Sequence, residues 1–168
     1  IAQDSDDQYD FCVCLQDPSD YPGNRIDLVG PNTFTVPSQR PDICHKYFNF
    51  LVPSQWVKDC YEKYDCWMEN TAHIWPVGID TNVWNVRSTP KSVDCLIYYK
   101  NADKEYLEKA INLCKEFGKS FGILEYGHYD EPTFQHACSI SKYSILCTKT
   151  ESQGVAYMEM LSSGLPCF

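Results

Sequence analysis

The sequence lacks any run of about 18 apolar residues, which is the length that a membrane-spanning helix requires. Its N-terminus has no basic segment followed by an apolar one, so we expect no export signal. Basic residues are few, since 14 Lys and Arg stand against 23 Asp and Glu and give a net charge of −9. No basic run is present to neutralise phosphates, so we expect no nucleic-acid partner. We therefore predict a soluble, cytoplasmic protein.

No Cys-x-x-Cys pair occurs among the ten cysteines. Cys95, Cys114 and Cys147 stand where small core residues are expected, which favours free, buried thiols over disulfides. A disulfide-stapled secreted domain is the other interpretation of so many cysteines. The grouping that most resembles a metal site consists of Cys60, Cys66 and His73. Its spacing matches no zinc site, so we expect no metal site.

Apolar runs of strand length alternate with segments of helical period. In the first half, strands are predicted at 9–15, 26–29, 48–52 and 73–76, with one helix at 54–64. In the second half, strands are predicted at 93–99, 120–126 and 143–148, and helices at 103–117, 130–141 and 152–163. Ser54 and Asp130 are expected N-caps, and Gly118 is an expected helix stop.

The regular strand–helix order after residue 92 predicts crossover connections and a mainly parallel, Rossmann-like sheet. The polar, proline-containing stretch 82–91 separates this half from the irregular one, so a domain boundary is predicted between residues 85 and 86. The fold class is therefore α/β. Ligands of such sheets bind beyond the carboxyl ends of the strands. The segments at those ends are 100–101, 127–128 and 148–154.

The segment 150–166 holds two carboxylates eight positions apart, Glu151 and Glu159, around an expected helix start. Eight residues of helix rise about 12 Å, roughly the separation of the sugar and the ribose in an extended nucleotide-sugar. Ser152, Gln153 and Gly154 would offer backbone amides to a diphosphate at the helix N-terminus, and glycine would allow a close approach of the backbone.

The residues Glu151-Ser152-Gln153-Gly154 through Glu159, followed by Gly164-Leu165-Pro166, resemble the Glu-x7-Glu signature of retaining, GT-B fold glycosyltransferases of the family 4-like group. A second passage resembles the end of their N-terminal domain: Pro53-Ser54-Gln55-Trp56-Val57, then Pro76-Val77-Gly78-Ile79-Asp80. The resemblance covers residues 48–168. It implies that 1–85 is part of an acceptor-side α/β domain with its linker, and that 86–168 is a truncated nucleotide-sugar-binding half of a longer enzyme.

The resemblance implies transfer of a sugar from a nucleotide-sugar to an acceptor, with retention of configuration and without a metal or other cofactor. Glu151, which would bind sugar hydroxyls, and Lys100, which would neutralise the diphosphate, are the expected catalytic residues. The expected donor-binding residues are Glu159, on the ribose, with Ser152, Gln153, Gly154, Lys104, Gly127 and His128. The acceptor is not identified.

Other interpretations remain open for these residues. Thr150 and Gln153 match a capping box, so one alternative is that Glu151 stabilises a helix start and has no role in binding. Lys100 can simply end a strand, and Glu159 can be a solvated helix position. The alternative to an enzyme is a non-catalytic α/β nucleotide-binding or interaction module.

Overall fold

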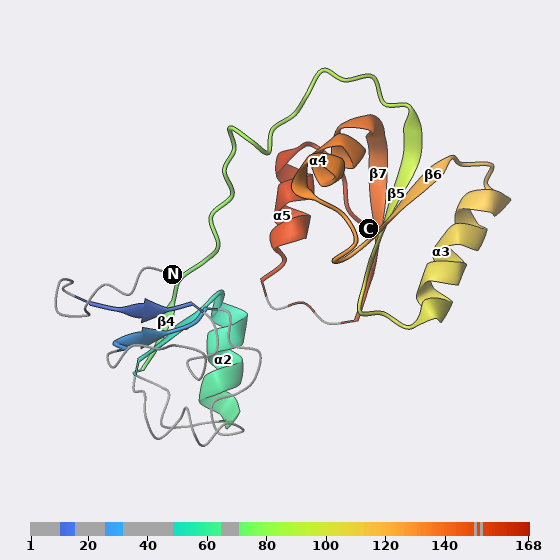
Figure 1. Cartoon of the computed structure of the whole chain (residues 1–168). Coiled ribbons are helices and arrows are strands. Elements are labelled where there is room, and N and C mark those ends of the chain that lie inside the picture. Colours follow the sequence, from blue (N-terminus) through green and yellow to red (C-terminus); the bar gives the residue numbers. More distant parts are fainter. Residues whose placement is uncertain (1–10, 16–25, 32–48, 65–70, 150, 152) are drawn as a thin grey trace. The chain divides into compact units, whose positions relative to one another are not determined.

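The computed structural model describes residues 11–15, 26–31, 49–64, 71–149, 151 and 153–168. The chain divides into two compact units, Ile1–Val77 and Gly78–Phe168. The described residues form two parallel sheets and four helices, which confirms the α/β class and the mainly parallel sheet (Figure 1).

The first unit contains a sheet of four short strands in the order β1-β2-β3-β4. The strands are β1 (Val13–Cys14), β2 (Leu28–Val29), β3 (Phe50–Val52) and β4 (Ala72–Ile74), and the helix α2 (Gln55–Tyr64) follows β3. Ser54 caps this helix as predicted, since its Oγ accepts a hydrogen bond from the Val57 amide at 3.3 Å. Val57 and Tyr61 turn the buried side of α2 onto β3, where Phe50 and Val52 are fully buried.

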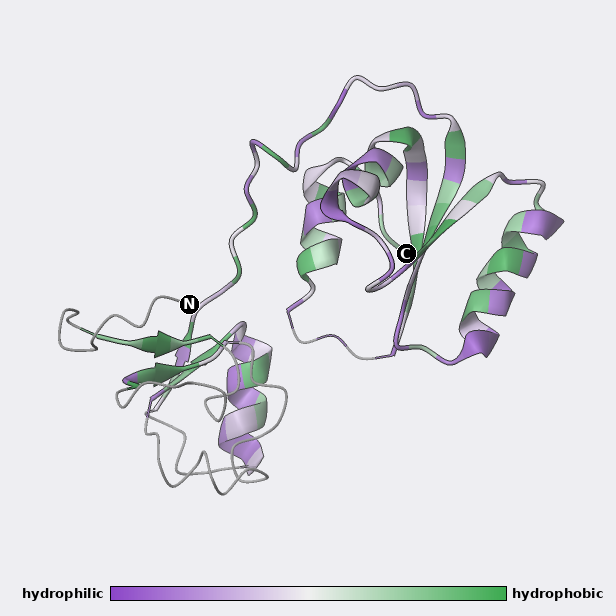
Figure 2. Ribbon diagram, in the orientation of Figure 1, coloured by the Kyte–Doolittle hydropathy of each residue, from purple (hydrophilic) through white to green (hydrophobic). Residues whose placement is uncertain are grey.

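The second unit alternates strands and helices along the chain. Its elements are β5 (Val93–Lys100), α3 (Lys104–Glu116), β6 (Phe121–Glu125), α4 (Glu131–Ile140), β7 (Ser141–Thr148) and α5 (Val155–Ser162). Hydrophobic residues run along the strands, and hydrophilic residues interrupt the hydrophobic ones along α3, as expected for a helix with one buried side (Figure 2). These elements match the predicted ones to within a few residues, with the largest difference at the start of the last helix.

The strand order β6-β5-β7 places the first strand of this unit in the middle of the sheet. The chain leaves β5 through α3 to reach β6, then crosses β5 through α4 to reach β7. Helix α3 covers one face of the sheet, whereas α4 and α5 cover the other (Figure 1). The loops after β5 and β7 therefore lead to opposite faces, which creates a switch point between their carboxyl ends, where ligands of such sheets bind.

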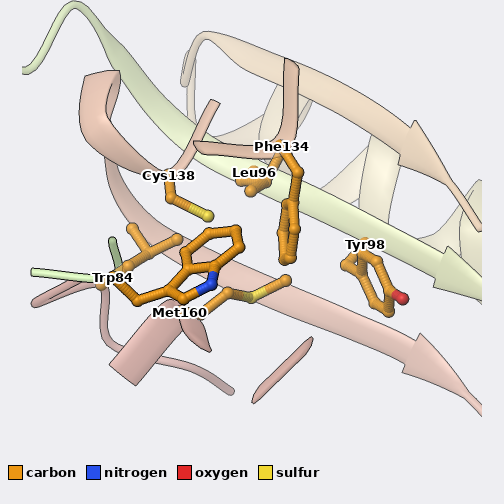
Figure 3. Close-up of a cluster of buried hydrophobic side chains, with 7 residues drawn as sticks. Trp84, Leu96, Tyr98, Phe134, Cys138 and Met160 are labelled. Atoms are coloured by element: carbon orange, nitrogen blue, oxygen red, sulfur yellow. The ribbon is translucent and has the colours of Figure 1, made fainter. Parts of the chain in front are cut away.

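The core under α4 and α5 is rich in aromatic residues (Figure 3). Trp84 and Tyr98 both pack against Phe134, with ring centroids 5.2 and 5.9 Å from it. The carbonyl of Trp84 also accepts a short hydrogen bond from Ser162 Oγ at 2.5 Å. Residues 78–92 are thus held by the second unit, and the boundary predicted between 85 and 86 falls inside it.

The other core lies under α3 and contains Cys95, Cys114 and Cys147, all buried. The structure contains them as free cysteines, as the sequence predicts. Burial raises the pKa of Cys95 to about 12, so this thiol stays protonated at neutral pH. These residues act as small apolar side chains between the sheet and the helix.

Candidate functional site

The carboxyl edge of the second sheet positions the predicted site residues. Lys100 and Thr148 are partners in the ladder between β5 and β7, and Tyr99 pairs with Glu125 of β6. The ladder continues one residue further, because the Tyr126 amide donates to the Tyr99 carbonyl at 2.9 Å. The three strands therefore end at the same level, and the residues that follow them are neighbours.

Lys100 and Glu151 form an ion pair across the switch point. The Nζ atom of Lys100 lies 2.7 Å from Oε2 of Glu151, and the side chains are only 19% and 18% exposed. The ammonium also lies 4.6 Å from the centre of the Tyr126 ring, in the range of a cation–π interaction. The Lys100 ammonium thus contacts both a carboxylate and an aromatic ring, in the place where the topology predicts a ligand.

The Glu151 carboxylate is stabilised in its charged form. Burial opposes ionisation of this group, but hydrogen bonds from Lys100 and from the Gly154 and Gln153 amides prevail and lower its pKa below the ordinary value. The Gln153 amide donates to Oε1 over a long 3.4 Å. Glu151 is therefore an anion at neutral pH, shared between an ammonium and backbone amides.

Helix α5 begins later than the sequence predicts. It starts at Val155 instead of residue 152, and Gly154 precedes it with φ +67°, a left-handed conformation that favours glycine. Hence Glu151 lies in the loop before the helix, and the estimate of about 12 Å from eight helical residues is wrong for this segment. The role of Gly154 in the fold is this backbone turn. Ser152 and Thr150 lie outside the described residues, so the predicted capping box is not tested.

Glu159 occupies a different environment from Glu151. It is half-buried on α5, and burial, followed by repulsion from Glu131 on α4, raises its pKa. Its charge also acts on the hydroxyl of Tyr129. The surroundings of Glu159 therefore disfavour its negative charge and favour a hydrogen-bond donor beside it.

Tyrosine hydroxyls connect the strand ends to the helices. Tyr129 donates to the hydroxyl of the buried Tyr98 at 3.1 Å, and Tyr157 of α5 donates to Thr148 Oγ1 at 2.6 Å. The ring of Tyr157 stands edge-on to that of Tyr98, with centroids 6.3 Å apart. The two contacts of Tyr157 hold the start of α5 against β5 and the end of β7.

The remaining predicted residues are exposed. Lys104 is the first residue of α3, on the face of the sheet opposite α5. Gly127, at φ +83°, and His128 form the turn after β6, where the His128 amide donates to the Glu125 carbonyl at 3.0 Å. The structure thus brings Lys100, Glu151 and Gln153 into one contact group, and leaves Lys104 and His128 at its periphery.

Sequence reasoning missed Tyr126, the aromatic neighbour of Lys100. The signal that could have found it is the strand register, since Tyr126 follows β6 directly at the level of Lys100. It also missed the electrostatic effect of Glu131 on Glu159, because no sequence spacing relates a residue of α4 to one of α5.

Within the described parts of the chain, no group of three His, Cys, Asp or Glu side chains could hold a metal ion. Among the helices described, none combines the length and the apolar character needed to cross a membrane. Comparisons with protein-family models, with curated proteins and with solved structures found no match to this chain.

Proposed function

We propose that the carboxyl edge of the second unit binds a nucleotide-sugar, and that the protein is a retaining glycosyltransferase. The observation that carries the proposal is the meeting of Lys100 and Glu151 at the switch point of a parallel sheet. A cation there suits the diphosphate of a nucleotide, and a carboxylate beside it suits sugar hydroxyls.

Each residue has a distinct part in this proposal. Lys100 neutralises the charge that develops on the departing phosphate oxygen, which lowers the barrier to transfer. Glu151 accepts hydrogen bonds from hydroxyls of the donor sugar. Glu159, whose surroundings favour a hydrogen-bond donor, accepts from the ribose. The exposed turn with Gly127 and His128 lines the side of the site nearest β6.

Direct binding tests the proposal. Thermal-shift titration against UDP, GDP, ADP and their glucose conjugates should show stabilisation that prefers one base. At ligand concentrations about 100-fold above Kd, the gain should be about 2.7 kcal/mol. Lys100→Ala and Glu159→Ala should weaken the shift, whereas Lys109→Ala and Glu108→Ala, on the exposed surface of α3, should not.

The outcomes separate the candidate functions. A cooperative melt with no response to any nucleotide would contradict the proposal. Binding of nucleoside diphosphates that is indifferent to the attached sugar and unaffected by Glu159→Ala would instead favour the non-catalytic module. The proposal includes a cytoplasmic site of action and an acceptor that is a glycan, a lipid, a protein or a small molecule.

A further inference from the structure

In the ion pair, the Glu151 carboxylate occupies the ammonium that a diphosphate would use. The inference drawn from this competition rests on the proposed function. Lys100 already holds an anion, because Glu151 Oε2 lies 2.7 Å from its ammonium. Both side chains are more than four-fifths buried, so water screens their attraction less than at the surface. A diphosphate that uses this ammonium must take the place of the carboxylate, since the two anions repel each other.

From this arrangement we infer that Glu151 competes with the diphosphate for the Lys100 ammonium. The site thereby favours the intact nucleotide-sugar over the free nucleoside diphosphate. Lys100 exchanges the carboxylate for phosphate oxygens when either ligand binds. The displaced carboxylate keeps the hydrogen bonds from the Gly154 and Gln153 amides but loses the one from the Lys100 ammonium. The hydroxyls of an attached sugar replace that lost donor, whereas a nucleoside diphosphate has no attached sugar to replace it.

The surroundings of the pair support such an exchange. The Tyr126 ring contacts the ammonium independently of the carboxylate, with 4.6 Å between Nζ and the ring centre. Glu151 lies in the loop before α5 and outside the helix, so its side chain can turn without breaking helical hydrogen bonds. The pair thus works as a selector that disfavours the leaving group after sugar transfer.

The test uses inorganic pyrophosphate, which carries no base or sugar, together with UDP, GDP and ADP and their glucose conjugates. Glu151→Gln keeps the size of the side chain and removes its charge, and it should bind pyrophosphate about tenfold more tightly, as expected for releasing a charged hydrogen bond. The control variant, Asp103→Asn, removes one charge from an exposed pair near the same edge. In that pair, Lys149 Nζ lies 3.9 Å from Asp103 Oδ2. This variant should change the affinity less than twofold.

The preferred nucleotide gives the second readout. In the wild type the glucose conjugate should bind more tightly than the diphosphate, and Glu151→Gln should reduce that preference about tenfold. Circular dichroism and the melting temperature verify that the variant is folded, and Glu151→Ala repeats the charge removal. If both Glu151 variants bind pyrophosphate no more tightly than the wild type does, the inference is overturned. That outcome leaves nucleotide-sugar binding, and the proposed function, intact. Tighter pyrophosphate binding in a chain that binds no nucleotide-sugar would instead contradict the proposed function alone.

Discussion

Lys100 and Glu151 are 51 positions apart in the sequence, yet their charged atoms lie 2.7 Å from each other at the end of two adjacent parallel strands. Register brings Lys100 level with Thr148, and three further residues bring the chain to Glu151. Any change that moves Glu151 away from the end of β5 should therefore break this pair.

The coupling between Lys100 and Glu151 should be measurable in unfolding. Lys100→Met leaves the largely buried Glu151 carboxylate without its cation, so we expect a loss of about 1–2 kcal/mol in the free energy of unfolding. Urea denaturation of this variant, of Glu151→Gln and of the double variant gives the interaction energy. Strict additivity of the two single effects would show that the contact contributes nothing to stability.

The two carboxylates of the site should respond to pH in opposite directions. The pKa of Glu151 is lowered by folding, so its stabilising effect is present above its unfolded value, near 4.5, and is lost as the pH falls through the folded pKa. Glu151→Gln should therefore be less stable than the wild type at pH 7, and the gap should close in acid.

Glu159 has a raised pKa, so it favours folding while protonated, and this advantage is lost as the pH rises through the folded pKa. Glu159→Gln should be more stable than the wild type at pH 7, with the difference vanishing below pH 4.5, near its unfolded value. Thermal melts from pH 3 to pH 8 check both curves. The same sign for both variants at pH 7 would contradict the assigned environments.

The N-caps of α3 and α4 offer a matched comparison. Asp130 Oδ1 accepts a hydrogen bond from the Thr133 amide at 3.0 Å, whereas Asp103 makes no side-chain cap at the start of α3. Asp130→Ala should cost about 1 kcal/mol, and Asp103→Ala a few tenths at most. Chemical denaturation measures both. Equal losses would mean that the cap hydrogen bond is not the source of the effect.

Trp84 should anchor the start of the second unit. Its side chain is 5% exposed and packs against Phe134, so Trp84→Ala should destabilise this unit by about 3–5 kcal/mol. Trp56, on α2, is 64% exposed, and Trp56→Ala should cost well under 1 kcal/mol. Amide hydrogen exchange locates the loss. Protection in β5 that survives Trp84→Ala would contradict the packing role.

The sequence by itself determined the alternation of elements, because that alternation rests on local causes. The apolar run at 93–99, the period of the α3 segment and the N-caps Ser54 and Asp130 act over a few residues, and they are found where they were predicted. It also singled out Lys100 and Glu151, through strand ends and a motif-like spacing.

Tertiary structure decided what those residues contact. The start of α5 at Val155 depends on the left-handed turn at Gly154 and on the contact of Tyr157 with Thr148, which act across the sheet edge. The cation–π contact of Tyr126, like the repulsion between Glu131 and Glu159, follows from strand order and helix packing. Periodicity indicates which face of an element is apolar, but the neighbours of that face are set by topology and register, because they join residues that are far apart in the chain.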